Sequence, residues 1–332
     1  MSYKASSFWD PAGFNPDLDS IKKDNEKLLN KEKFIKNNFK KIFGIFSAIF
    51  LLILGYLIYL SLMPNNNLDL VVIIFYFFLI PIIALGIFNG YLRNLKKDLV
   101  KLKIATDKKW LYNPHKRSDM YHAYVRKFPE IFRLGDRNHN FEDVFWGDFE
   151  KDKLKHNFVS GVFNYSRVVR TNKSTTTVNY TDHFFVLKLQ KKVTSRLHLY
   201  PRNALSGVAN LFSKKDIKTE SIEFNKTFSF CYEKNNSEVK IDIMKILSPR
   251  VIEELVSYSK AKKRIGRSLS NGVKVLFQND YIMFLSPGPL FRHFKVGLTP
   301  KSLDTKDTEL KDLWEELNFY LDVSSDISKY IH

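Results

Sequence analysis

Two long apolar runs, separated by a short polar turn, stand out in the first third of the chain. The first run, Ile42 to Leu62, has about 21 residues without a charge, and the second, Leu70 to Leu92, about 23; a helix needs about 20 to cross a bilayer. The turn between them, Met63 to Asp69, contains a proline and three asparagines, which favour a helix end. The pattern predicts a transmembrane helical hairpin over residues 42–92.

The interior of this hairpin carries no Lys, Arg, Asp, Glu or His. Ion and proton pathways usually place ionisable groups inside the membrane, so the hairpin is expected to be an anchor. The alternative, two buried helices of a soluble core, is disfavoured by the length of the uncharged runs. Gly86 and Gly90 set two small residues on one face of the second span, which permits close helix approach and a homo-oligomer.

Helical periodicity continues on both sides of the hairpin. Residues 16–41 have apolar positions at spacings of three and seven, with Asp17 or Asp19 as the N-cap. Residues 93–105 predict a basic helical stalk with one apolar stripe. That stripe consists of Leu92, Leu95, Leu99 and Leu102. The two flanking helices either pair with each other or lie on the lipid headgroups with their lysines extended to water.

The first 15 residues show neither helical nor strand periodicity, which predicts an irregular N-terminal arm. This arm contains the aromatic residues Phe8, Trp9 and Phe14. Aromatic side chains in a terminal segment are expected to dock either on the folded domain or on a partner.

Residues 106–332 have the pattern of a mixed globular domain. A helix is expected over Thr106–Lys127, around Pro114, and a mobile polar loop over Thr171–Thr181. Later helices are expected after Ser248-Pro249 and over Lys306–Leu321. The expected strands are Phe158–Val169, His183–Leu189, Val193–Tyr200, Ile222–Tyr232 and Val239–Met244, followed by a hairpin of Val273–Phe277 and Tyr281–Leu285. Helices at both ends of mostly antiparallel strands predict an α+β domain.

The charge distribution gives this arrangement an orientation. Lysines and arginines crowd the chain before the first apolar run and after the second, while the turn has none, so both ends are expected in the cytoplasm. Of the net charge of +18, +7 comes from 16 basic and 9 acidic residues up to Trp110, and +11 from 37 basic and 26 acidic residues after it. Such an excess suits contact with anionic headgroups or nucleic acid. The single cysteine, Cys231, excludes an intramolecular disulfide.

Four short segments carry a resemblance to a known family. They are Ile131-Phe132-Arg133-Leu134-Gly135-Asp136-Arg137, Glu142-Asp143-Val144-Phe145-Trp146-Gly147, Glu223-Phe224-Asn225-Lys226-Thr227-Phe228 and Ile246-Leu247-Ser248-Pro249. These segments follow the paired spans in an order and at a spacing that resemble a bacterial family of uncharacterised two-helix membrane proteins, a domain of unknown function (DUF3137-like). The resemblance extends from Ile42 to Leu285. Where that family has a Phe-Gly-Leu-Phe-like segment, this chain has His183-Phe184-Phe185-Val186. The resemblance implies the architecture, a cytoplasmic domain and the bacterial inner membrane, and it implies no reaction.

A polar segment containing Asp136, His139 and Asp143 is the candidate metal site. Carboxylates beside a histidine bind a divalent cation or perform acid/base chemistry when the fold brings them within reach. Their spacing matches no metal-binding motif, and a turn whose acids cap backbone groups or pair with Arg133 and Arg137 is the favoured alternative. A membrane-bound metal-dependent hydrolase is therefore one alternative function.

A basic run at the end of a predicted helix is the strongest candidate binding patch. It consists of Lys260, Lys262, Lys263, Arg264 and Arg267. These residues suit a helix C-terminus and solvation, or contact with anionic lipid, or contact with RNA. Lipid is favoured over RNA because the membrane is adjacent, and no RNA-binding motif interleaves aromatic and basic residues. No phosphate-binding loop or dinucleotide fingerprint is present, so no cofactor is expected.

Together these patterns predict a membrane-anchored cytoplasmic scaffold that tethers a partner protein or the anionic bilayer surface, and they favour a non-enzymatic role without excluding an enzyme. Its expected contact residues are the basic run and the aromatic residues of the arm. A membrane-tethered RNA-binding protein is the second alternative, although a nucleic-acid partner is not expected. The predicted location is the inner membrane, with two spans and both termini in the cytoplasm.

Overall fold

The computed structural model describes most of the chain, as two compact units. The described residues are 9–61, 70–151, 153–171, 174–202, 219–232, 243–244, 246–263, 272–288, 318, 321–322 and 325, apart from the side chains of 43, 61, 70–78, 80–81, 194–195, 230–232 and 261–263. Among them, residues 22–103 form a helical unit. Residues 9–21, those from 104 to 288 and the four near the C-terminus form the second unit, which contains the sheet.

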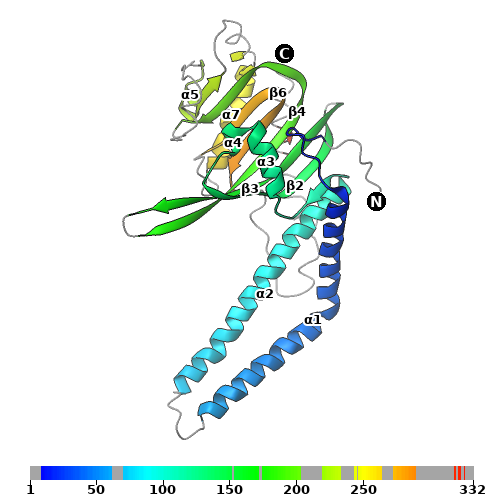
Figure 1. The fold of residues 1–332 in the computed structure, drawn as a ribbon, viewed down its shortest axis with the longest axis vertical. Helices are drawn as coiled ribbons and strands as arrows, with labels where there is room; N and C mark the ends of the chain where they lie inside the picture. The colour runs from blue at the N-terminus through cyan, green and yellow to red at the C-terminus, as the bar shows by residue number, and fades with distance from the viewer. Residues whose placement is uncertain are drawn as a thin grey trace. The chain divides into compact units, whose positions relative to one another are not determined.

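Two long helices dominate the first half of the chain. Helix α1 (Leu18–Ser61) begins where Asp17 Oδ1 accepts hydrogen bonds from the backbone N–H groups of Asp19 and Ser20, so Asp17 is its N-cap. Figure 1 shows that α1 changes direction part-way along. Asn38 Nδ2 donates to the carbonyl oxygen of Phe34 (3.0 Å), and a side chain that enters the backbone ladder bends a helix.

Helix α2 (Leu70–Asp107) carries the predicted second span and the predicted stalk in one continuous element. It ends at Asp107; two residues later Lys109 has a left-handed backbone (φ 60°), and Trp110 N–H donates to the carbonyl oxygen of Ala105 (2.7 Å). The connection between α1 and α2, including the predicted turn from Met63 to Asp69, lies outside the described residues.

The second unit is built on one antiparallel sheet, so the predicted α+β class is confirmed. Its strands are β1 (Leu111–Asn113), β2 (Arg137–Lys151), β3 (Leu154–Arg170), β4 (Thr175–Pro201), β5 (Phe228–Tyr232) and β6 (Lys274–Pro287). The spatial order is β1-β2-β3-β4-β5, and β6 also pairs with β4. The helices of this unit are α3 (Ser118–Lys127), α4 (Pro129–Phe132), α5 (Ile222–Thr227) and α7 (Pro249–Lys263).

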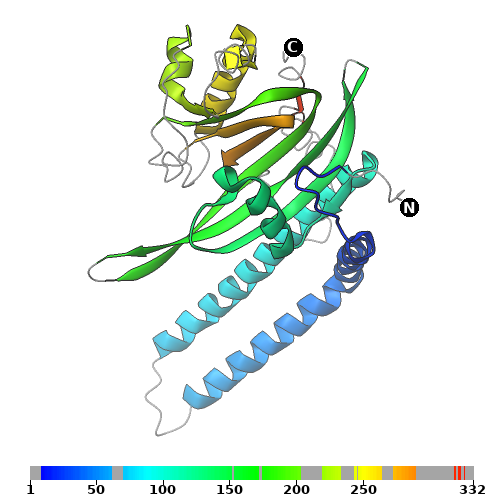
Figure 2. The same ribbon diagram turned by 45° about the horizontal axis from the view of Figure 1, so that its top comes forward.

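Helices cover both faces of this sheet (Figures 1 and 2). Adjacent residues of a strand point to opposite faces, so Phe184 and Phe185 of β4 mark the two sides. Phe184 packs in the aromatic cluster formed with α3 and α4. Phe185 is paired with Phe284 of β6, and Phe284 packs edge-on against Tyr258 of α7 (ring centroids 5.2 Å).

An aromatic cluster forms the centre of the core, and Phe132 in α4 lies in the middle of this cluster. The Phe132 ring lies within 6.4 Å of five other rings, and all six side chains are almost fully buried. These rings are Tyr124, Phe128, Phe141, Phe163 and Phe184. All five of these pairs are edge-to-face, an arrangement that ring quadrupoles favour.

A glycine in β2 allows a tryptophan to lie flat on the sheet. A Cβ atom at Gly147 would stand 2.3 Å from Cδ1 of Trp110, closer than atoms can approach. Trp110 is fully buried, and its Nε1 donates to the carbonyl oxygen of Asp148 (2.8 Å). The missing side chain at Gly147 thus joins the end of α2 to the sheet.

Three predictions of secondary structure were wrong for local reasons. The helix expected over Thr106–Lys127 is interrupted by β1, because Pro114 disfavours helix at the residue before it and the segment from Leu111 is buried against β2. The strand expected over Ile222–Tyr232 begins as helix α5, because the hydroxyl of Ser221 caps it through Phe224 N–H (3.2 Å). Strand β2 falls in the segment that was interpreted as a polar turn.

Two further predictions failed because strands in this sheet are longer than their hydrophobic patterns. The hairpin expected at Val273–Leu285 is one strand, β6: Asn279 (φ 50°) pairs with Val193 of β4 where a turn was expected, and the extra residues of the register shifts beside this pair lie on β4. The runs expected at 183–189 and 193–200 belong to the single strand β4, which begins at Thr175, inside the expected loop. Most of Val239–Met244 and of the helix expected at 306–321 lies outside the described residues.

Candidate functional site

The apolar half of α1 exposes large hydrophobic side chains all round. They include Ile45, Phe46, Ile49, Leu51, Leu52, Tyr56, Ile58 and Tyr59, each at least 44% exposed. Over the described residues, one helix, Leu18–Leu60, is long and apolar enough to cross a membrane, and its most apolar window is not buried at all. An exposed apolar surface of this extent marks a contact with lipid or with another protein.

The N-terminal half of α1 has a different pattern. Ile21, Leu28 and Ile35, seven residues apart, are buried, whereas most lysines of this segment are exposed. A single buried stripe is typical of a helix that packs on protein. The change from one stripe to an apolar surface on all sides takes place near Ile42, where the first span was predicted to begin.

Helix α2 shows the same change in reverse. Ile82, Ile83 and Ile87 are more than half exposed, and Leu85 and Tyr91 are about as exposed as the apolar residues of α1. The predicted stalk stripe beyond them is covered by protein, with every member at most 7% exposed. It consists of Leu92, Leu95, Leu99 and Leu102. Such burial does not fit a stripe lying on headgroups, the second arrangement considered for this segment.

Gly86 and Gly90 are exposed on α2, and a Cβ atom built on either would meet nothing within 4 Å. The described part of the chain therefore leaves this small-residue face uncovered. Self-association through it stays a prediction.

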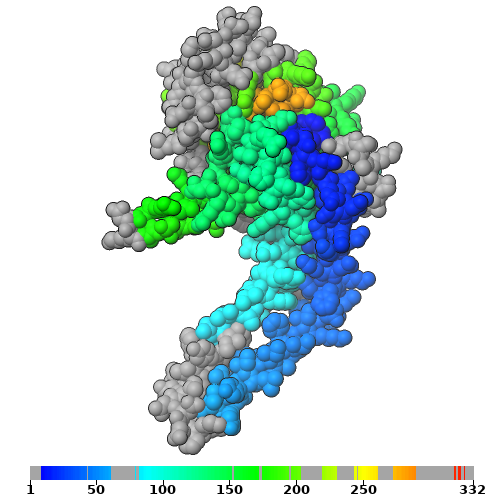
Figure 3. Space-filling model, viewed as in Figure 1, coloured from blue at the N-terminus to red at the C-terminus, as the bar shows by residue number. Residues whose placement is uncertain are grey.

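The N-terminal arm is fastened to the sheet domain by one carboxylate, that of Asp10. Its Oδ1 accepts hydrogen bonds from the backbone N–H groups of Ala12 (2.8 Å) and Phe14 (3.1 Å). Its Oδ2 accepts from the hydroxyl of Tyr124 (2.9 Å) and from Nε1 of Trp146 (3.1 Å). We call this arrangement the Asp10 latch. Figures 2 and 3 show the dark-blue arm lying against the segment that contains α3 and β2.

The aromatic residues of the arm make contacts within the chain. Phe14 stacks on Trp146 (centroids 6.4 Å) and lies under the guanidinium of Arg117. Trp9 packs against the core cluster and lies under the ammonium of Lys188. Trp9 and Phe14 therefore dock on the folded domain, which is one of the two arrangements expected for the arm. Phe8 lies outside the described residues.

Asp10 was missed in the sequence, although Asp10-Pro11 is a turn-initiating pair. Burial raises the pKa of the Asp10 carboxyl above 3.8, its ordinary value, and the four hydrogen bonds oppose this rise without cancelling it. The folded protein therefore holds a proton at Asp10 more tightly than the unfolded chain does. The stability that this protonation contributes is complete below pH 3.8 and is lost as the pH rises through the folded-state pKa.

We expect Asp10→Asn, which cannot ionise, to remove this loss of unfolding free energy with rising pH. At pH 7, Asp10→Ala should lower the free energy of unfolding by about 2–4 kcal/mol, because buried donors lose their acceptor. Urea unfolding at several pH values measures both effects, with the exposed Asp148→Asn as the control. A pH profile of Asp10→Asn identical to that of the unsubstituted protein would contradict the assignment.

The candidate metal ligands are not brought together. Asp136 Oδ2 accepts from Val168 N–H (2.8 Å), and Asp143 Oδ1 accepts from the hydroxyl of Tyr112 (2.8 Å). His139 Nε2 lies 2.7 Å from the carbonyl oxygen of Leu134. In the described part of the chain no three His, Cys, Asp or Glu side chains are placed to hold a metal ion. The contact of Asp136 with a backbone N–H fits the alternative to a metal site, in which the acids of this segment cap backbone groups.

Of the basic run, only Lys260 has a described side chain; it is exposed and forms an ion pair with Glu223. The side chains of Lys262 and Lys263, and all of Arg264 and Arg267, lie outside the described residues. The binding role of this run stays a prediction.

A second basic surface lies on the two-stranded end of β3 and β4, where a loop was expected. Beyond the pair of Arg137 with Ser166, residues 167–170 pair only with residues 175–178 among the described strands. We call residues 167–170 and 174–181 the β3–β4 arm; it projects beyond the rest of the sheet (Figures 1, 2 and 3). Arg167 and Arg170 are exposed on it, as are the hydroxyl side chains from Ser174 to Thr177.

Several polar groups are buried inside the sheet domain. Tyr165 donates to Asp182 Oδ2 (2.8 Å), and Ser160 Oγ lies 2.8 Å from Nε2 of His183. Burial, with Lys274 and Arg196 nearby, lowers the pKa of His198 to about 3. Burial likewise lowers the pKa of Lys274 to about 8, opposed by Asp182. At neutral pH His198 is therefore uncharged.

Comparison with known proteins adds little. No family model matches the chain, and no curated protein matches it, so the resemblance to the DUF3137-like family stays a prediction. The crystal structure of the mycobacterial trehalose monomycolate transport factor A, TtfA, aligns with 70% of this chain and 94% of its own, at 9% identity and a TM-score of 0.33. A similarity at this level carries no argument about fold or function.

Proposed function

We propose that this protein is a membrane-anchored binding module with two membrane spans and a cytoplasmic sheet domain. The observation that carries the proposal is the uncharged surface of α1 beyond Ile42, where large apolar side chains are exposed on all sides. In water such a surface is unfavourable at roughly 25 cal/mol for each Å² of apolar area, whereas in lipid this cost disappears. The exposed isoleucines of α2 support a second span.

The basic flanks of both apolar segments support the orientation. Lys40 and Lys41 precede the uncharged part of α1, and Arg93 follows that of α2. Positive residues stay on the cytoplasmic side of a membrane, so the sheet domain would lie in the cytoplasm. A bacterial inner membrane remains the location that the family resemblance implies.

The β3–β4 arm is the surface that we propose for tethering. It offers two exposed arginines, exposed hydroxyl groups and strand edges that the described strands do not cover. Arginine and hydroxyl side chains bind carboxylates and phosphates, so the expected partner surface is acidic: a protein or the anionic bilayer. The net charge of +11 after Trp110, from 37 basic and 26 acidic residues, favours the same kind of partner.

The experiment is charge reversal on the arm of the full-length protein. Arg167→Glu/Arg170→Glu should reduce, by at least about tenfold, the recovery of a co-purifying protein from mild detergent or the contact of the arm with anionic nanodiscs. The matched control is Lys191→Glu/Lys192→Glu, which reverses two exposed charges elsewhere on β4. Equal losses in both variants, or none in either, would reject the arm as the tether, and a loss of bound RNA alone would favour the RNA-binding alternative.

A further inference from the structure

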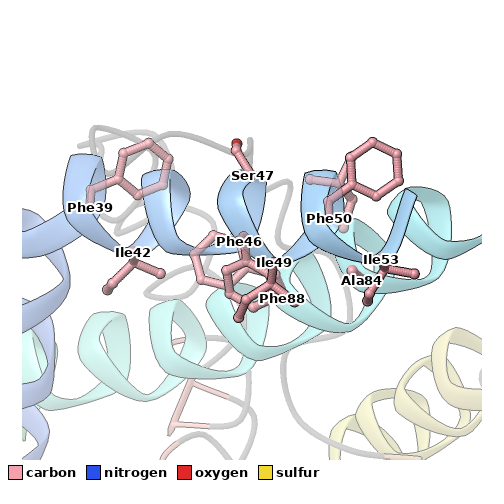
Figure 4. Close-up of a pocket in the computed structure, with 10 residues that line it drawn as sticks. Phe39, Ile42, Phe46, Ser47, Ile49, Phe50, Ile53, Ala84 and Phe88 are labelled. Carbon is pink, nitrogen blue, oxygen red and sulfur yellow. The ribbon is translucent and has the colours of Figure 1, made fainter. Parts of the chain in front are cut away.

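An apolar groove runs between α1 and α2 in the segment that we assign to the membrane. It has a volume of about 290 Å³. Ten residues line it, and nine of them are aliphatic or aromatic: Phe39, Ile42, Phe46, Ile49, Phe50, Ile53, Ala84, Leu85 and Phe88, with Ser47 as the tenth. Phe46 of α1 and Phe88 of α2 meet at its centre (centroids 6.4 Å; Figure 4). The volume is close to the lower limit for small-molecule pockets, and the lining suits hydrocarbon.

The groove extends from the side of the basic residues to about the middle of the bilayer. At 1.5 Å per residue, Ile53 is about 18 Å along α1 from Lys41, and Ala84 is about 14 Å along α2 from Arg93. Half of the hydrocarbon core is about 15 Å thick. A ligand in the groove would therefore come from the leaflet on the side of these basic residues.

The end of the groove nearest the headgroups is positively charged. Lys40 is exposed and lies seven residues before Ser47, which places it on the same face of α1, two turns away. Lys41 and Arg93, which border the uncharged parts of α1 and α2, are also exposed. No acidic residue occurs in α1 after Glu32 or in α2 before Asp98. An apolar groove with a basic end is complementary to an anionic lipid.

We propose that this groove binds one acyl chain of an anionic phospholipid from the cytoplasmic leaflet, with the lipid phosphate held by Lys40 and Lys41. The inference rests on the proposed membrane anchor and adds a specific lipid site to it. A chain seated there fills space that neither helix fills alone. A helix of a second copy is the competing occupant.

The test is native mass spectrometry of the full-length protein, solubilised from membranes in mild detergent. The unsubstituted protein should carry one anionic phospholipid, and Ala84→Phe, which fills the groove, should lower its occupancy at least tenfold. Ala48→Phe is the matched control, because Ala48 is exposed on α1 and does not line the groove. Lys40→Glu/Lys41→Glu should abolish the preference for anionic over zwitterionic lipid, and Lys31→Glu/Lys33→Glu should keep it.

Three results would overturn the proposal: no retained lipid, equal lipid loss in Ala84→Phe and Ala48→Phe, or a dimer that only Ala84→Phe dissociates. Carbonate extraction of the same membranes separates this failure from failure of the anchor. If the unsubstituted protein is washed from the membranes, the proposed function fails with the lipid site. If it stays integral but carries no lipid, only the lipid site fails.

Discussion

Replacing Phe132 by alanine is expected to lower the free energy of unfolding of the sheet domain by about 3–5 kcal/mol, the range for buried phenylalanine truncations. Phe132 is fully buried, and its ring contacts five other aromatic rings: one from α3, one from Phe128 between α3 and α4, and three from strands. Because these neighbours come from separate elements that hold one another in place, the cavity should collapse only partly.

Urea unfolding of the full-length protein in detergent measures this loss, through the fluorescence of Trp110 and Trp146 in the same domain. The control is Phe34→Ala, the same substitution at a side chain that is 60% exposed on α1, where a change of at most about 0.5 kcal/mol is expected. A loss below about 1 kcal/mol for Phe132→Ala would show that the aromatic cluster is not the centre of the core.

Placing two arginines in the exposed apolar part of α1 is expected to prevent its insertion into the membrane. Leu51 and Leu52 are 62% and 74% exposed and stand near the middle of the uncharged segment. Each arginine at the centre of a span costs about 2.5–3.5 kcal/mol, so Leu51→Arg/Leu52→Arg opposes insertion by about 5–7 kcal/mol. The matched control, Leu29→Arg/Phe34→Arg, places two charges at exposed positions before the uncharged segment.

Insertion is measured by labelling a cysteine at Asn66, in the predicted turn, from outside the cell, with Cys231 replaced by serine. Labelling should occur in the otherwise unsubstituted protein and in the control, and it should disappear in Leu51→Arg/Leu52→Arg. If the cysteine is inaccessible from outside in all three proteins, the two-span topology is wrong. If labelling is equal in all three, α1 crosses no membrane at Leu51 and Leu52.

Patterns that repeat along one helix could be interpreted from sequence, because each depends only on neighbouring residues. The uncharged segment from Ile42 and the stripe from Leu92 to Leu102 are helical as the pattern predicted, and Asp17, one of the two expected caps, begins α1. A helix satisfies its own backbone hydrogen bonds, so the run of residues is enough to indicate it.

Strand lengths and turns in the sheet were less predictable, because a strand depends on a neighbour that is remote in sequence. Asn279 looked like a turn between two short strands, yet pairing with β4 on both sides of it makes β6 continuous. The polar residues from Thr175 have no hydrophobic alternation and still form a strand, because Arg170 and its neighbours pair with them. At both places, pairing with the neighbouring strand outweighed the local conformational propensity of the residues.

The features of the candidate site likewise divide into those that a local pattern indicates and those that depend on tertiary packing. The amino-acid sequence by itself determined that a long apolar helical segment with basic flanks precedes a basic α+β domain, since composition and periodicity are local properties. The tertiary structure alone decided that Asp136, His139 and Asp143 have separate partners and that Asp10 fastens the arm through Tyr124 and Trp146. Which polar groups meet depends on how separate elements pack; the partners of Asp10 lie more than 100 residues away in sequence, and no local pattern records such a pairing.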